Sequence, residues 1–172
     1  MPQALADRVA LVTGASRGIG YAAALALARA GAHVVAVART VGGLEELDDA
    51  ISAAGGSATL VPLDMRDYDG LYRLAAGLNE RHARLDVLLG NAGAAAVPSP
   101  LGHIEPKTWD EVMAVNVTAN WHLIRAMGEK GRDPVRPQFT DHCFTGEYPT
   151  PLTDQAGHQA PPRQLSLLAE AG

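Results

Sequence analysis

Cysteine and lysine are both scarce in this 172-residue chain. Cys143 is the single cysteine, so an internal disulfide framework cannot form. His142 precedes it, but this pair lacks the spacing of a known ligand set, and we expect no metal site. The formal net charge of −5 and the pI near 5.6 give no sign of a nucleic-acid-binding surface.

Long hydrophobic runs are missing as well. The longest apolar run, Tyr21–Ala28, is too short to cross a bilayer. The N-terminal sequence MPQALADRVA lacks the basic region and the apolar stretch of a signal peptide. Hydrophobic residues nevertheless make up 47% of the chain, which is enough for a globular core. We therefore expect a cytoplasmic protein that has neither a membrane partner nor a nucleic-acid partner.

Valine and isoleucine nearly disappear after Met127. Val135 is the only one of either type among residues 128–172, which hold six of the eleven prolines. Stretches such as GRDPVRPQ and YPTPLTD are typical of turns and coil. These features predict a folded domain over residues 1–127 and an irregular or disordered tail over residues 128–172.

The first 127 residues contain alternating strand and helix patterns. Buried strands are expected at 8–13, 33–38, 57–63 and 85–90, and amphipathic helices at 19–30, 41–54 and 68–82. A long helix is expected from near Lys107 to Met127, after an irregular connection over residues 98–106. Repeated alternation indicates βαβ units, and hence an α/β fold whose parallel sheet carries helices on both faces.

Three glycines separate the first expected strand from the first expected helix. Gly14, Gly18 and Gly20 form a G-x-x-x-G-x-G turn. Glycines permit the tight turn and a close approach of ligand and backbone, and the helix N-terminus then points N–H groups at a phosphate. An ordinary glycine-rich turn is the alternative, but the strand–turn–helix context favours a dinucleotide site.

The end of the second strand indicates which dinucleotide is bound. Sites for NAD usually carry an acidic residue there, which accepts a hydrogen bond from the ribose 2′-hydroxyl. This chain has Arg39 instead, and Arg17 in the glycine turn could reach the same region. Because a guanidinium pairs with phosphate through two hydrogen bonds, NADP is favoured over NAD. On the sequence alone, Arg39 could also be a solvated charge after a strand.

Three motifs resemble those of the short-chain dehydrogenase/reductase family: TGASRGIG at 13–20, NAG at 91–93 and NVT at 116–118. The resemblance covers about residues 5–127. It implies a Rossmann-type doubly wound parallel sheet, incomplete here, with about four strands in the order 3-2-1-4. It also implies hydride transfer between NADP(H) and a small carbonyl or alcohol substrate.

The resemblance assigns roles to single residues. Asp64 matches the residue that binds the adenine amino group, and 91–93 match the segment that stabilises the sheet and lines the cofactor site. Asn116 matches the catalytic asparagine, which lies at a helix kink and holds a water in the proton relay. With the two arginines, the expected cofactor-binding residues are Gly14, Ser16, Arg17, Gly18, Ile19, Gly20, Arg39, Asp64, Met65, Asn91, Ala92 and Gly93.

Three of these positions also have simpler interpretations. Asp64 could merely begin the loop before a helix, and Asn91 could serve as a turn former. Asn116 could be a polar residue that mildly weakens its helix. Its apolar neighbours, however, suggest that it is partly buried and needs a hydrogen-bond partner.

The rest of the catalytic pattern is absent from the chain. The family uses a Tyr as acid and base, a Lys four residues later, and a Ser. The two lysines, Lys107 and Lys130, follow His103 and Ala126 at that spacing, so the sequence contains no Tyr-x-x-x-Lys. No serine lies between Ser99 and Ser166. We therefore expect a truncated form that at most binds its cofactor. The alternative is a non-enzymatic nucleotide-binding or interaction protein on the same scaffold.

The strand expected at residues 85–90 lies at the edge of a four-stranded 3-2-1-4 sheet. An apolar edge strand presents unpaired N–H and C=O groups, which are a template for association. We therefore expect self-association through this edge.

Overall fold

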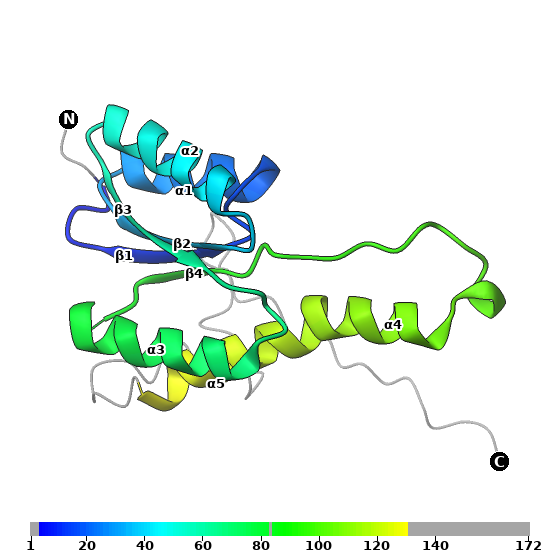
Figure 1. The fold of residues 1–172 in the computed structure, drawn as a ribbon. Helices are drawn as coiled ribbons and strands as arrows, with labels where there is room; N and C mark the ends of the chain where they lie inside the picture. The colour runs from blue at the N-terminus through cyan, green and yellow to red at the C-terminus, as the bar shows by residue number, and fades with distance from the viewer. Residues whose placement is uncertain (1–3, 83, 131–172) are drawn as a thin grey trace, which may run out of the picture. The chain divides into compact units, whose positions relative to one another are not determined.

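Strands and helices alternate along the first part of the chain, as Figure 1 shows. The computed structural model describes residues 4–82 and 84–130. The alternating elements are β1 (Val9–Thr13), α1 (Gly18–Arg29), β2 (His33–Ala38), α2 (Val41–Ala53), β3 (Ser57–Pro62), α3 (Tyr68–His82) and β4 (Val87–Leu89). The bounds of β2 and α3 agree with the prediction, whereas β4 is shorter than the expected strand over residues 85–90.

The four strands form one parallel sheet in the order β3-β2-β1-β4. This confirms the predicted Rossmann-type α/β fold and its strand order. In the described part of the chain, β4 pairs only with β1, through the register Val12↔Leu89. Self-association through the other edge of β4 stays a prediction.

Both faces of the sheet are covered by helices, and each face has its own core. Figure 1 shows α1 and α2 over one face and α3 and α5 (Ala119–Lys130) over the other. Side chains alternate between the faces along each strand. Val12 and Val34 therefore pack on the α1/α2 face, while Leu11 and Val35 pack on the α3/α5 face. Burial on both faces explains why β1 and β2 consist of continuous apolar runs.

The chain after β4 differs from the predicted single helix. The expected irregular connection contains a short 3-10 turn, η1 (Leu101–His103), and α4 (Pro106–Met113) then begins with a proline. A π-helical turn, η2 (Ala114–Thr118), separates α4 from α5. Sequence periodicity does not reveal such a turn, because it inserts a single residue into an otherwise continuous pattern.

The chain divides into two compact units, residues 1–133 and 134–172, and the second lies outside the described residues. Helix α5 continues past Met127 to Lys130. The predicted domain boundary at residue 127 therefore stays a prediction, and the predicted tail lies almost wholly outside the described residues. Among the described helices, none has the length and apolar character that a membrane span requires.

Candidate cofactor site

The carboxyl ends of all four strands meet at one edge of the sheet. Thr13 pairs with Val37 on β2, Ala38 pairs with Pro62 on β3, and β1 also pairs with β4. The segments that follow the strands, 14–17, 39–40, 63–67 and 90–94, therefore begin at this edge, which we call the carboxyl edge. Ligands of open α/β sheets bind in this position. Every predicted site residue except Asn116, Gly18, Ile19 and Gly20 lies in one of these segments.

The glycine turn after β1 has the geometry that its sequence predicts. Gly14 and Gly18 have φ values of 65° and 58°, which favour glycine. A Cβ on Gly20 would lie 2.3 Å from the carbonyl oxygen of Gly14 and 2.5 Å from Nδ2 of Asn91. Gly14 and Gly20 thus let the turn, the first turn of α1 and the segment after β4 approach one another.

Thr13, Asn91 and Ala92 fasten the glycine turn to the segment after β4. The amide Nδ2 of Asn91 donates to the carbonyl oxygens of Thr13, at 3.1 Å, and of Gly14, at 3.3 Å. The N–H of Ala92 donates to Oγ1 of Thr13 at 3.0 Å. Thr13 is fully buried, and its hydroxyl lies 3.4 Å from the carbonyl oxygen of Leu89. In this structure Asn91 and Ala92 therefore shape the turn together with Thr13, a role that was not predicted for Thr13.

The N-terminus of α1 is open to a ligand. Arg17, its N-cap residue, makes no capping side-chain bond, and the first turn contains no acidic residue. A Cβ on Gly18 would meet no heavy atom within 4 Å, and Ile19 is 80% exposed. Free N–H groups and the positive end of the helix dipole suit an anion, so these residues fit the pyrophosphate of a dinucleotide.

Two arginine side chains beside this turn make no hydrogen bond or ion pair with the rest of the protein. In residues 4–82 and 84–130, neither the Arg17 nor the Arg39 guanidinium donates a hydrogen bond or forms an ion pair, and both residues are exposed. Helix α2 starts nearby, and a Cβ on Gly43 would lie 2.8 Å from the carbonyl oxygen of Ser16. Two guanidinium groups at the carboxyl edge form a donor set that suits phosphate.

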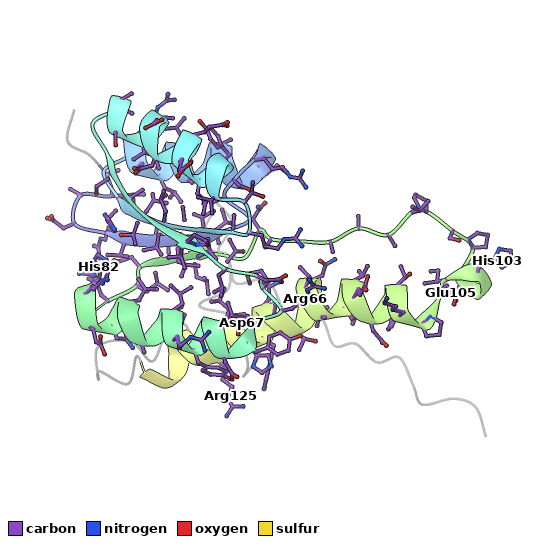
Figure 2. All side chains as sticks on the ribbon, in the orientation of Figure 1. Arg66, Asp67, His82, His103, Glu105 and Arg125 are labelled. Atoms are coloured by element: carbon purple, nitrogen blue, oxygen red, sulfur yellow. The ribbon has the colours of Figure 1, made fainter. Side chains whose placement is uncertain are left out.

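Asp64 follows β3 and is already engaged. Both of its carboxylate oxygens accept from the Arg66 guanidinium, at 3.2 and 2.9 Å, and Oδ1 also accepts from the Arg66 N–H at 2.9 Å. The hydrogen bond from the Arg66 side chain lowers the pKa of Asp64, and the positive charge of Arg39 acts in the same direction. Figure 2 shows Arg66 and Asp67 at the end of α3 opposite to His82. Arg66 is not among the residues predicted from the sequence.

The remaining predicted residues differ in how much of them is accessible. The side chain of Met65 is only 6% exposed and packs in the core on the α3/α5 face. Contact between Met65 and a cofactor stays a prediction, and only the main chain of Met65 could make this contact. Gly93 is exposed, and a Cβ there would lie 3.3 Å from Oδ1 of Asn116.

Asn116 lies in the middle of the π-helical turn, where the resemblance implied a helix kink. The residue is exposed, so the expectation of partial burial is wrong, but it does have a hydrogen-bond partner. Its side chain pairs with the main chain of Ala94. Oδ1 accepts from the Ala94 N–H at 2.7 Å, and Nδ2 donates to the Ala94 carbonyl oxygen at 2.9 Å. The side-chain amide thus imitates a neighbouring strand and fastens the segment after β4 to η2. A catalytic role for Asn116 stays a prediction.

The described tyrosines lie on α1 and α3. The hydroxyl of Tyr68 donates to the Ala114 carbonyl oxygen at 3.5 Å, and that of Tyr72 lies 3.2 Å from Nδ1 of His122. Tyr21 packs against the core on the α1/α2 face. No lysine follows any of these tyrosines at the spacing of the family's catalytic pair, and Tyr148 lies outside the described residues.

Comparison with known proteins identifies the family of this chain. The family model for short chain dehydrogenases matches residues 8–131, which include every predicted site residue. The chain therefore belongs to the short-chain dehydrogenase family.

Similar proteins have been identified in both sequence and structure. The dehydrogenase/reductase SDR family member 11 of Bos taurus is 41% identical over 158 residues, which are 91% of this chain and 58% of the relative. A metagenomic short-chain oxidoreductase solved with NADP is 42% identical, with a TM-score of 0.70 over 73% of this chain and 57% of that one. A carveol dehydrogenase of Mycobacterium avium, solved with NAD, is 26% identical with the same TM-score over 75% of this chain and 51% of that one. The chain thus spans somewhat more than half the length of these relatives.

Proposed function

We propose that this chain binds NADP(H), in preference to NAD(H), at the carboxyl edge of its sheet. The observation that carries the proposal is the pair Arg17 and Arg39, two exposed guanidinium groups without protein partners in the described part of the chain. They flank an uncapped helix N-terminus that suits a pyrophosphate. A similar protein solved with NADP supports the proposal, although another was solved with NAD.

The family context gives the reaction class. A bound nicotinamide supplies hydride chemistry, and the substrates of such oxidoreductases are small carbonyl compounds or alcohols. In this chain Arg39 and Arg17 would hold the 2′-phosphate, the first turn of α1 would hold the pyrophosphate, and Asp64 would face the adenine. Asn91 and Thr13 keep the glycine turn in shape.

We expect these 172 residues to bind the cofactor without turning over a substrate. The sequence has no Tyr-x-x-x-Lys, and a positioned acid or base contributes on the order of 10²–10⁴-fold to a rate. The same observation favours a second candidate, a nucleotide-binding protein without enzymatic activity. An assay of NADPH oxidation against a panel of aldehydes and ketones distinguishes both from an active oxidoreductase. Turnover above the background of cofactor alone would contradict the expectation.

The test of cofactor preference is a fluorescence titration of NADPH and NADH against the unmodified chain and Arg39→Asp. The unmodified chain should bind NADPH more tightly. Arg39→Asp should weaken NADPH binding by roughly tenfold to a hundredfold, because it replaces a charge-assisted hydrogen bond with a repulsion. Arg29→Asp is the matched control, since Arg29 is an exposed arginine in the last turn of α1, away from the carboxyl edge. Equal midpoints for NADPH and NADH in the unmodified chain would disprove the preference.

A further inference from the structure

Asn120 touches the site from the first turn of α5, and no motif points to it. Its Nδ2 donates to the carbonyl oxygen of Asn116 at 2.8 Å. That carbonyl belongs to the π-helical turn η2, in which the regular pattern of main-chain hydrogen bonds is interrupted. The side chain of Asn120 therefore adds a donor where the helix changes its winding.

The other end of the same amide reaches the end of β4. A Cβ on Gly90 would lie 2.6 Å from Oδ1 of Asn120 and 3.4 Å from its Cγ. Because real Cβ atoms do not approach an oxygen so closely, the place that Asn120 occupies requires glycine at position 90. Gly90 and Asn120 thus form a matched pair, in which the missing side chain of one admits the amide of the other.

The pair completes a clamp on the segment 90–94. Ala94 is held by the two hydrogen bonds of the Asn116 side chain, while Asn120 packs on Gly90 and fixes the carbonyl of Asn116. On the opposite side of the segment, Asn91 and Ala92 are fastened to β1. Residues 90–94 are therefore held between the glycine turn and η2.

The position of this clamp determines which part of a dinucleotide it serves. Arg39 and Asp64 follow β2 and β3, whereas the clamp follows β4, and the glycine turn after β1 lies between them in the sheet order. A dinucleotide whose pyrophosphate lies at the glycine turn and whose 2′-phosphate meets Arg39 has its adenosine half on the β2/β3 side. Its nicotinamide half must then extend toward the β4 side.

We propose that Asn120 is a positioning residue for the nicotinamide half of the cofactor, acting through Asn116 and the segment 90–94. Gly90 is its partner, because the missing side chain leaves room for the Asn120 amide. This inference rests on the proposed function, because it presupposes that NADP(H) binds at the carboxyl edge. It extends that function by a residue pair that contributes to one half of the ligand alone.

The test compares two ligands in four proteins: the unmodified chain, Asn120→Ala, Gly90→Ala and the double variant. NADPH carries the nicotinamide half, whereas adenosine 2′,5′-bisphosphate lacks it. Each single variant should weaken NADPH binding by about three- to tenfold, the scale of one lost hydrogen bond, and leave the bisphosphate affinity unchanged. Gly90→Ala acts because its methyl group displaces the Asn120 amide. The double variant should therefore be no weaker than either single variant.

Two further variants separate positioning from general destabilisation. Asn120→Leu keeps the approximate size of the side chain but removes the donor without adding a charge, and it should reproduce Asn120→Ala. Asn79→Ala removes an asparagine from α3 and should change neither affinity. Urea unfolding of each variant identifies any that fails to fold, and in that case Asn120→Leu carries the test.

The outcomes are distinct. If both ligands weaken together, or if the effects of Gly90→Ala and Asn120→Ala add, the inference is wrong while the proposed function stands. If NADPH affinity does not change in any variant, the inference is also wrong. If the unmodified chain binds neither NADPH nor the bisphosphate, the proposed function fails and the inference fails with it.

Discussion

The two edges of the sheet treat their polar groups in opposite ways. At the amino edge, where the strands begin, Asp86 accepts hydrogen bonds from Arg8 at 2.8 Å, from the Val9 N–H at 3.0 Å, and from Arg84. His33 lies there between the hydroxyls of Ser57 and Thr59, at 2.8 and 2.9 Å. At the carboxyl edge, Arg17 and Arg39 make no such bonds with the described residues, and the N-terminus of α1 has no side-chain cap.

The difference between the two edges indicates that the charges of the amino edge contribute to stability and the free cations of the carboxyl edge to binding. The amino edge uses its charges within the protein, and the side chain of Asp86 is only 6% exposed as a result. Apart from the ion pairs of Asp64 with Arg66 and of Asp67 with Arg73, the carboxyl edge uses neutral amides and a buried threonine to hold its own shape. It leaves the Arg17 and Arg39 guanidinium groups and the N–H groups of the α1 N-terminus for a ligand. Substitutions at the amino edge should therefore change unfolding, and exposed charges at the carboxyl edge should change affinity.

The largest expected effect is at the glycine turn, which is an exception to this contrast because its shape contributes to both stability and ligand binding. In Gly20→Ala the new methyl group would collide with the main chain of Gly14, which cannot move away as a flexible side chain would. We expect a loss of about 3 kcal/mol in the free energy of unfolding, measured with urea, together with loss of NADPH binding.

Gly77→Ala is the matched control for this substitution. Gly77 lies in α3 with open space around its Cβ position, and alanine favours a helix. Gly77→Ala should stabilise the chain by about 0.5–1 kcal/mol. Similar unfolding midpoints for the two variants would show that the close approach at Gly20 does not constrain the fold.

The next effect concerns the amino edge alone. Burial alone would raise the pKa of Asp86, but hydrogen bonds from Arg84, the Val9 N–H and Arg8 outweigh it and lower the pKa to about 2. A carboxyl group with a lowered pKa contributes stability that is fully present above the ordinary value of 3.8. This contribution is lost as the pH falls from there toward 2. The shift corresponds to roughly 2 kcal/mol.

Asp86→Asn should therefore destabilise the chain at pH 7 by roughly 2 kcal/mol and flatten the decrease in stability below pH 4. Urea unfolding at pH 7, 4 and 3 measures both changes. The affinity of the folded fraction for NADPH should not change, because the residue lies at the amino edge. Asp49→Asn, which removes an exposed carboxylate from α2, serves as the control. If the free energy of unfolding of Asp86→Asn decreased below pH 4 as steeply as that of the unmodified chain, this role of the carboxylate would be contradicted.

Much of the fold could be predicted from the sequence because its causes are local. Continuous apolar runs predict β1 and β2, and apolar residues three and four positions apart predict α2 and α3. The glycine turn was predictable too, since Gly14 and Gly20 meet physical requirements that other residues cannot meet.

What the sequence could not predict depends on contacts between distant residues. The bonds from Asn91 to Thr13 and Gly14 join positions more than seventy residues apart. The pairing of Asp64 with Arg66 is local, yet a sequence cannot show whether an aspartate after a strand faces a ligand or its own neighbour. The match between Gly90 and Asn120 requires knowledge of how α5 crosses the end of β4. Thr13 is the one polar residue in the apolar run VALVT, and this is the sequence signal that could have indicated its role.

The smallest expected effect concerns the pair of Asp64 and Arg66, and it tests whether paired charges at the carboxyl edge also influence binding. Arg66 neutralises a carboxylate that interacts with Arg39 through its charge. In Arg66→Ala the charge of Asp64 is no longer paired, so it weakens the positive potential that attracts a 2′-phosphate. Because 49% of the Arg66 side chain and 33% of the Asp64 side chain are exposed, solvent screens this pair. We therefore expect NADPH binding to weaken by only about two- to threefold at low salt, with less change at high salt.

The double variant Arg66→Ala/Asp64→Asn distinguishes this charge effect from a direct contact of Arg66 with the ligand. The asparagine in Asp64→Asn keeps an oxygen that can accept from the adenine amino group but carries no charge. The potential around Arg39 is thereby restored, so the affinity for adenosine 2′,5′-bisphosphate should return close to that of the unmodified chain. The affinity for NADH should change little throughout, since NADH carries no 2′-phosphate. If the double variant stays as weak as Arg66→Ala, then Arg66 itself contacts the adenosine half, and the carboxyl edge has a third cation that serves the ligand.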